Sequence, residues 1–143
     1  MRLFSELSKI SGRVAVITGA NGYVGRVLSK NLAEAGSNLF LVDIDKKSLA
    51  QLGRSLSSDY GVQVRTLAID LEKIDSAERL FDEVSLHYSR IDILINNAAF
   101  VGTSNITGWC TDFEKQSVST WRRCLEVNLT FPFSLIQACL PLI

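Results

Sequence analysis

A glycine-rich segment near the N-terminus has residue types and a spacing that can bind a phosphate group. Residues 18–25, of sequence TGANGYVG, lie between a short apolar run and a segment with apolar residues at helical spacing. Glycines at such a junction allow a tight turn, close approach of the backbone to a pyrophosphate, and close packing of helix on sheet. The N–H groups and the dipole of the helix's first turn then attract the anion. This order of strand, glycine turn and helix predicts a dinucleotide-binding site.

Asp43 supplies a second group at the expected distance along the chain. It follows Gly25 by 18 residues, at the end of a second apolar run, close to the roughly 20 residues typical of the acid that binds the adenine ribose. A carboxylate accepts hydrogen bonds from a ribose diol and repels a 2′-phosphate, so Asp43 favours NAD over NADP. The alternative role for Asp43 is an ordinary helix N-cap. Asp70, at the end of a third run, is open between a turn or cap role and contact with the cofactor.

Strands that alternate with helices would position these residues. Four short apolar runs are typical of strands buried in a parallel sheet, and they cover residues 14–17, 39–42, 62–69 and 91–95. Segments with apolar residues at helical spacing follow them, with their caps, at 24–35, 45–61, 75–88 and 118–140. Asp75 with Glu78 three residues on predicts a capping box. The alternation predicts an α/β fold, a Rossmann-type doubly wound parallel sheet with about four strands.

Composition and charge exclude several classes of protein. The 143 residues hold fifteen Lys and Arg against fifteen Asp and Glu, and this balance argues against nucleic acid as a partner. No apolar run approaches the ~20 residues of a membrane helix, and the N-terminus lacks the apolar core of a signal peptide. We therefore expect a cytoplasmic protein that does not span a membrane. Cys110, Cys124, Cys139 and the single His87 are too far apart in sequence to predict a metal site.

Several motifs resemble those of the short-chain dehydrogenase/reductase family, in the family's order and spacing. They are residues 18–25, Asp70, Asn96-Asn97-Ala98-Ala99 and Trp121…Val127-Asn128-Leu129, and the resemblance runs from residue 11 to the end. It implies an NAD(P)-dependent oxidoreductase that transfers a hydride between the nicotinamide cofactor and a small alcohol or ketone. By that resemblance the pyrophosphate would be held by Gly19, Asn21, Gly22, Tyr23, Val24 and Gly25. Asp43 would bind the ribose, Asp70 and Leu71 would lie along the adenine, and Asn96, Asn97 and Ala98 would pass the nicotinamide-side ribose and tie the fourth strand to its neighbours.

Asn128 is the candidate catalytic residue. Pro132 lacks the N–H that would bond the carbonyl of Asn128 in an α-helix, and this gives a local reason for a kink. The resemblance implies that this carbonyl holds a water in the proton relay to a catalytic Lys. The alternative is a helix break without catalytic meaning.

The glycine spacing departs from the pattern of the family's single-domain branch and leaves alternatives open. Tyr23 stands where the single-domain branch usually has Gly, and the spacing of Gly19, Gly22 and Gly25 is typical of the extended branch, which includes sugar-nucleotide epimerases and dehydratases. The Asn-Asn-Ala-Ala and Val-Asn-Leu segments favour the single-domain branch. A non-catalytic dinucleotide-binding remnant is the third interpretation.

The family's catalytic Ser and Tyr-x-x-x-Lys are not found in this sequence. Tyr23, Tyr60 and Tyr88 have no Lys four residues on. We therefore expect residues 1–143 to be one Rossmann domain, a fragment interrupted before those residues, which binds cofactor without turnover. We expect the full-length form to be a homo-oligomer. The segments around Trp109 and Trp121 resemble family members that make sugars of surface glycans.

Overall fold

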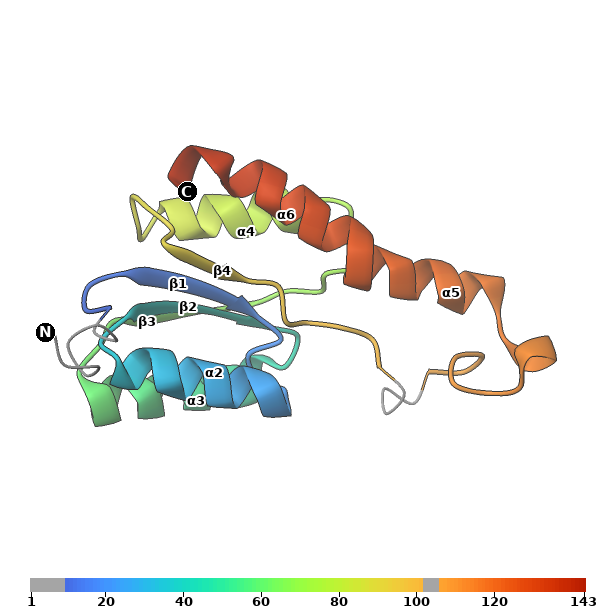
Figure 1. Ribbon diagram of the computed structural model, residues 1–143, viewed down its shortest axis with the longest axis horizontal. Helices are drawn as coiled ribbons and strands as arrows, with labels where there is room; N and C mark the ends of the chain where they lie inside the picture. The colour runs from blue at the N-terminus through green and yellow to red at the C-terminus, as the bar shows by residue number, and fades with distance from the viewer. Residues whose placement is uncertain (1–9, 102–105) are drawn as a thin grey trace, which may run out of the picture.

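A parallel sheet between two layers of helices forms the molecule (Figure 1). The computed structural model describes residues 10–101 and 106–143. The strands are β1 (Val14–Thr18), β2 (Asn38–Asp43), β3 (Val64–Ala68) and β4 (Ile93–Ile95), in the spatial order β3-β2-β1-β4. Helices α2 (Tyr23–Glu34) and α3 (Lys46–Tyr60) cover one face, and α4 (Ser76–Ser85) and α6 (Phe131–Cys139) cover the other. This confirms the doubly wound α/β fold. β2 and β3 are added on one side of β1 and β4 on the other, so the order of the strands reverses between β1 and β4.

Strand β1 is the centre of the core. All five of its residues are buried, and they alternate between two apolar clusters. Val14 and Val16 belong to the cluster under α4 and α6, whereas Ala15 and Ile17 belong to the cluster under α2 and α3. Burial on both faces explains why the strand is continuously apolar in sequence instead of alternating with polar residues.

Strands β3 and β4 are shorter than the sequence predicts. β3 begins at Val64 instead of residue 62, and β4 begins at Ile93 instead of residue 91. The residues before each strand bond to other parts of the chain. The Gln63 N–H donates to the Asn38 side chain at 3.0 Å, and the Ile91 N–H donates to the Leu142 carbonyl at 2.7 Å. These groups satisfy their hydrogen bonds outside the strand ladders, which shortens both strands.

Asp45 caps the helix that follows it, whereas the capping box predicted at Asp75 does not form. The Asp45 carboxylate accepts from the N–H groups of Lys47 and Ser48 at 3.0 and 3.1 Å at the start of α3. The Asp75 carboxylate makes no capping bond at the start of α4, and it pairs instead with Arg79 at 3.7 Å. Asp75 has ψ of 3°, whereas a capping residue has extended backbone that turns its oxygen back to the helix.

The last helical segment changes its winding at Asn128. Helix α5 (Val118–Leu125) runs into a π-helical turn (Glu126–Thr130), then α6, then a 3₁₀ turn (Leu140–Leu142); another 3₁₀ turn covers Phe113–Lys115. A π-turn inserts one residue into the helical repeat, and such turns occur often at functional sites. The position agrees with the irregularity predicted near Pro132.

The same segment, Val118–Leu142, is long and apolar enough to cross a bilayer by length and composition. This corrects the expectation that no stretch of the chain reaches that length. One such helix is weak evidence for a membrane segment, because core helices pass the same test. Here one face of the helix lies in the core, through Val127, Phe131, Leu135 and Cys139 at intervals of four residues.

Candidate functional site

The turn between β1 and α2 can be formed only by glycine at two positions. Gly19 has φ of +64°, and a Cβ there would lie 2.7 Å from the Ala98 Cα. A Cβ on Gly25 would lie 2.1 Å from the Gly19 carbonyl oxygen. The first turn of α2 therefore packs directly on the loop that precedes it. Its leading N–H groups have no partner within the helix by geometry, and they face the end of the sheet where ligands bind in this architecture.

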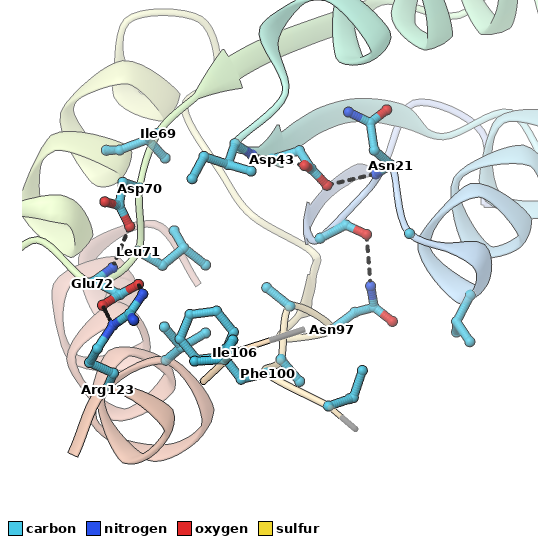
Figure 2. Close-up of a pocket in the computed structure, with 18 of the residues that line it drawn as sticks. Asn21, Asp43, Ile69, Asp70, Leu71, Glu72, Asn97, Phe100, Ile106 and Arg123 are labelled. Carbon is cyan, nitrogen blue, oxygen red and sulfur yellow. Dashed lines mark hydrogen bonds and ion pairs between the residues drawn. The ribbon is translucent and has the colours of Figure 1, made fainter. Parts of the chain in front are cut away.

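Asp43 joins this turn to the end of β2. One carboxylate oxygen accepts from the Asn21 N–H at 2.8 Å, and the other accepts from the Ile44 and Asp45 N–H groups at 2.8 and 3.3 Å (Figure 2). The cap of α3 is Asp45, so the alternative reading of Asp43 as an ordinary N-cap is wrong. Arg26 also holds the turn, because its Nε donates to the Asn21 carbonyl at 2.9 Å. The carboxylate is thus fixed at the end of β2, beside the glycine turn.

Asn97 joins β4 to the same turn. Its side-chain amide donates to the carbonyls of Thr18 and Gly19, both at 3.0 Å. The backbone N–H groups of Asn97 and Ala98 both donate to the Thr18 hydroxyl, at 3.1 Å each. These four bonds fix the carboxyl end of β4 against the carboxyl end of β1, the point at which the chain reverses direction across the sheet.

A cavity of about 860 Å³ opens at this end of the sheet. The structure brings most of the predicted cofactor residues into its lining: Gly19, Asn21, Gly22, Tyr23, Val24, Asp43, Asp70, Leu71, Asn97 and Ala98. Three predicted site residues are not in the lining: Gly25, which is buried beneath the turn, and Asn96 and Asn128, which are exposed. The volume falls within the roughly 300–1,000 Å³ typical of ligand pockets.

Asp70 makes a local turn and also lies in the lining of the cavity, so its contact with a cofactor stays a prediction. One of its oxygens accepts from the Glu72 N–H at 3.0 Å, which makes a local turn, and the residue also lines the cavity. Lys73 approaches the other oxygen at 3.9 Å. Leu71 beside it is buried.

The Asn128 side chain makes two hydrogen bonds with the backbone of Phe100. Its Oδ1 accepts from the Phe100 N–H at 2.7 Å, and its Nδ2 donates to the Phe100 carbonyl at 3.1 Å. Pro132 singles out the carbonyl of Asn128 in the sequence, and no sequence pattern predicts this side-chain contact. Asn128 therefore fixes the loop after β4 from its place in the π-turn.

The remaining lining residues were not identified from sequence. They are Ile44, Ile69, Glu72, Ala99, Phe100, Val101, Ile106, Arg123 and Val127. Several of them directly adjoin a predicted motif, and that adjacency was the available signal. Arg123 lies in the segment around Trp121, for which the sequence predicted a substrate class and no contact with the cofactor residues. Its guanidinium forms a two-point ion pair with Glu72, and this hydrogen bonding holds the pKa of the Glu72 carboxyl below its usual value. In the described residues, no group of three or more His, Cys, Asp or Glu could hold a metal ion.

Comparison with known proteins shows the same family along almost the whole chain. A family model described as short chain dehydrogenase matches residues 13–143. The rhamnolipids biosynthesis 3-oxoacyl-(acyl-carrier-protein) reductase of Pseudomonas aeruginosa is 33% identical over 134 residues, which are 94% of this chain and 49% of that protein. D-threitol dehydrogenase of Mycolicibacterium smegmatis is 29% identical over 130 residues, 91% of this chain and 47% of that protein.

Two solved structures with bound cofactor have the same fold. The Pseudomonas aeruginosa RhlG/NADP complex matches with a TM-score of 0.82 and 32% identity, over 94% of this chain and 49% of that one. L-sorbose reductase from Gluconobacter frateurii, complexed with NADPH and L-sorbose, matches with a TM-score of 0.83 and 27% identity, over 94% and 48%. The chain spans about half the length of the curated relatives that it matches.

Proposed function

The chain belongs to the short-chain dehydrogenase family, and from this premise we propose that its cavity binds a nicotinamide dinucleotide as part of an alcohol or ketone oxidoreductase. The observation that carries the proposal is the meeting of the glycine turn, Asp43 and Asn97 around one cavity at the reversal point of the sheet. These groups come from the ends of three different strands, and together they offer sites for a pyrophosphate and for ribose hydroxyls.

The turn itself fits such a cofactor. A Cβ at Gly19 or Gly25 would collide with backbone atoms at 2.7 and 2.1 Å, so the loop and helix lie as close as glycine allows. Close packing of this kind exposes backbone N–H groups to an anion with no side chain between. A bound nicotinamide ring would supply the donor or acceptor of a hydride. The residues of this chain would bind and orient it.

We propose NAD as the preferred cofactor. Asp43 places its negative charge beside the turn. Its lone pairs can accept hydrogen bonds from ribose hydroxyls in addition to the one from the Asn21 N–H. A 2′-phosphate at that place would meet this charge at close range. Relatives are known in complex with NADP(H), so the preference rests on Asp43 in this chain alone.

We propose that Asn128 acts in a proton relay through its backbone carbonyl. The support is its place in a π-turn four residues before Pro132, with its side chain anchored on Phe100. The acid/base pair of the family reaction, Tyr-x-x-x-Lys, does not occur within residues 1–143. We expect these residues alone to bind cofactor without catalytic turnover.

For the substrate, we propose a small alcohol or ketone of the carbohydrate class, including a sugar of surface-glycan biosynthesis. The resemblance of the segments around Trp109 and Trp121 favours this class, and two relatives carry polyol or sugar names, D-threitol dehydrogenase and L-sorbose reductase. The extended-branch alternative, a sugar-nucleotide epimerase or dehydratase, is favoured by the spacing of Gly19, Gly22 and Gly25. Net release of reduced cofactor by the full-length protein would indicate the alcohol or ketone oxidoreductase, because an epimerase or dehydratase makes no net redox change.

We further propose a cytoplasmic protein that forms a homo-oligomer in its full-length form. The support is an exposed apolar row along α5 and α6, which a second copy could cover. Its members are Val118, Trp121, Leu125, Leu129, Phe133 and Ile136.

Calorimetric titration of the purified chain with NAD tests the central proposal. We expect micromolar to millimolar binding that Gly19→Val abolishes, because the added side chain would clash with Ala98. Gly61→Asn is the matched control, since Gly61 also has positive φ but open space around it, and Asn tolerates that backbone. Binding that survives Gly19→Val, or no binding by the parent chain when Gly61→Asn and the parent are both folded, would overturn the proposal.

A further inference from the structure

An ion pair crosses one wall of the cavity between segments that are 51 residues apart. Arg123 Nε lies 2.7 Å from one Glu72 oxygen, and its Nη2 lies 2.8 Å from the other. Figure 2 shows the Arg123 side chain reaching from its helix to Glu72, with Asp70 and Leu71 adjacent. This parallel, two-point geometry is the strong form of an Arg–carboxylate contact, and both residues line the cavity.

Glu72 belongs to the short connection between β3 and α4. The same connection carries Asp70 and Leu71, the residues expected along the adenine. The Glu72 N–H donates to the Asp70 carboxylate at 3.0 Å, so the backbone of Glu72 sets the orientation of Asp70. At its start the connection is held by the Ile69 N–H on the Asp43 carbonyl, at 3.0 Å. The ion pair between the Glu72 side chain and Arg123 fixes the middle of the connection.

Arg123 also contacts the loop after β4. Its guanidinium carbon lies 5.6 Å from the centre of the Phe100 ring, within the range of a cation–π contact. The backbone of Phe100 is in turn held by the Asn128 side chain. One arginine thus joins three parts of the cavity wall: helix α5, the β3–α4 connection and the loop after β4.

We propose that Arg123 and Glu72 are positioning residues for the adenosine half of the cofactor: their pair fixes the β3–α4 connection so that Asp70 and Leu71 meet the adenine. The proposal rests on the proposed function of the cavity. A connection that is already ordered loses less conformational entropy when a ligand binds. Loss of the pair therefore lowers the affinity for ligands that contain the adenosine half, and it spares those that contain only the nicotinamide half.

Titrations with two parts of the cofactor test this assignment. ADP-ribose is the cofactor without its nicotinamide ring and so contains the adenosine, whereas nicotinamide mononucleotide contains the nicotinamide, its ribose and one phosphate without the adenosine. We expect Arg123→Met and Glu72→Gln each to weaken ADP-ribose binding about three- to tenfold, with nicotinamide mononucleotide changed by less than twofold. The double variant is expected to be no weaker than the weaker single variant, because both changes remove one interaction.

Arg79→Met is the matched control. Arg79 is also in an ion pair on a helix, with Asp75 at 3.7 Å, but it does not line the cavity, so its loss is expected to leave ADP-ribose binding unchanged. A merely structural role for Arg123 would weaken both halves together in proportion to a loss of thermal stability, and that result would overturn the proposal. So would unchanged ADP-ribose affinity in both single variants.

Failure of the proposed function looks different. In that case the parent chain does not bind ADP-ribose, or Gly19→Val does not reduce its binding. If only the positioning role is wrong, the parent chain binds ADP-ribose and Gly19→Val does not, while Arg123→Met binds ADP-ribose with the affinity of the parent.

Discussion

Neutralising Asp43 without changing its shape tests how the chain distinguishes its cofactors. In Asp43→Asn the side-chain oxygen still accepts from the Asn21 N–H, which lies 2.8 Å from the carboxylate in the parent. The turn therefore keeps its hydrogen bond to Asn21, while the charge is lost and the amide nitrogen that replaces the other oxygen no longer accepts from the Ile44 and Asp45 N–H groups. If the ribose 2′-oxygen lay at hydrogen-bond distance from the carboxylate, roughly 2.7 Å, the centre of a phosphate on that oxygen would lie about 5 Å from the centre of the carboxylate.

The expected magnitude follows from Coulomb's law. A carboxylate and a doubly charged phosphate about 5 Å apart repel by about 1.7 kcal/mol even at the permittivity of water. Removing that repulsion is expected to raise NADP affinity by more than tenfold. NAD affinity is expected to fall by about tenfold, since a hydrogen bond to a charged group contributes about 1.5–3 kcal/mol against about 0.5–1.5 for a neutral one. The ratio of the two affinities would thus change by about a hundredfold.

Calorimetric titration of both cofactors, at fixed low salt, measures this ratio. Far-UV circular dichroism and a urea midpoint for each variant show whether the fold is retained. A ratio that changes by less than threefold in a folded Asp43→Asn variant would refute the reasoning, because the carboxylate would then not lie near the 2′ position.

Three further predictions follow from packing and ionisation. Gly25→Ala is expected to abolish NAD binding and to lower the free energy of unfolding by about 1–3 kcal/mol, since a Cβ would lie 2.1 Å from the Gly19 oxygen; a folded variant that titrates like the parent would contradict it. Asn97→Ala is expected to cost about 1–3 kcal/mol in urea unfolding, because the carbonyls of Thr18 and Gly19 lose donors at 3.0 Å; a cost below the error of the fit would show that other donors replace them. Burial raises the pKa of Cys139 from 9.0 to about 11, so the free energy of unfolding is expected to fall as pH rises from about 9 to about 11, where the unfolded thiol ionises first. In Cys139→Ala the free energy of unfolding should fall less steeply over this pH range in pH-dependent unfolding curves. An unchanged slope would contradict the assignment of the fall to Cys139.

The sequence predicted those features that depend on backbone geometry or on continuous burial. Gly19 and Gly25 must be glycine because any Cβ would meet backbone atoms, and a strand such as β1 that is buried on both faces must be apolar throughout. Constraints of this kind act on residue type at fixed spacing, so the order of strands, turns and helices and the position of Asp43 could be read directly.

Features that depend on tertiary contacts could not be predicted in this way. The start of β4 depends on a bond between Ile91 and Leu142, which are far apart in sequence. Asp75 has the residue type of a cap but the wrong backbone angle for one. The contact of Arg123 with Glu72 joins a helix to a connection 51 residues earlier, and no local pattern in the sequence predicts a contact over that separation.

Strand β1 contributes side chains to both apolar clusters, and this affects how the protein unfolds locally. Its residues pack alternately under α4 and α6 and under α2 and α3, so detachment of either helix layer leaves half of the strand's side chains still buried. Amide exchange by such partial openings therefore proceeds in the outer layers first, and β1 exchanges only when the whole domain unfolds. The glycine turn is the direct continuation of β1, so its first anchor belongs to the most protected segment of the chain. The proposed phosphate site is therefore expected to stay assembled during local fluctuations of the outer walls of the cavity.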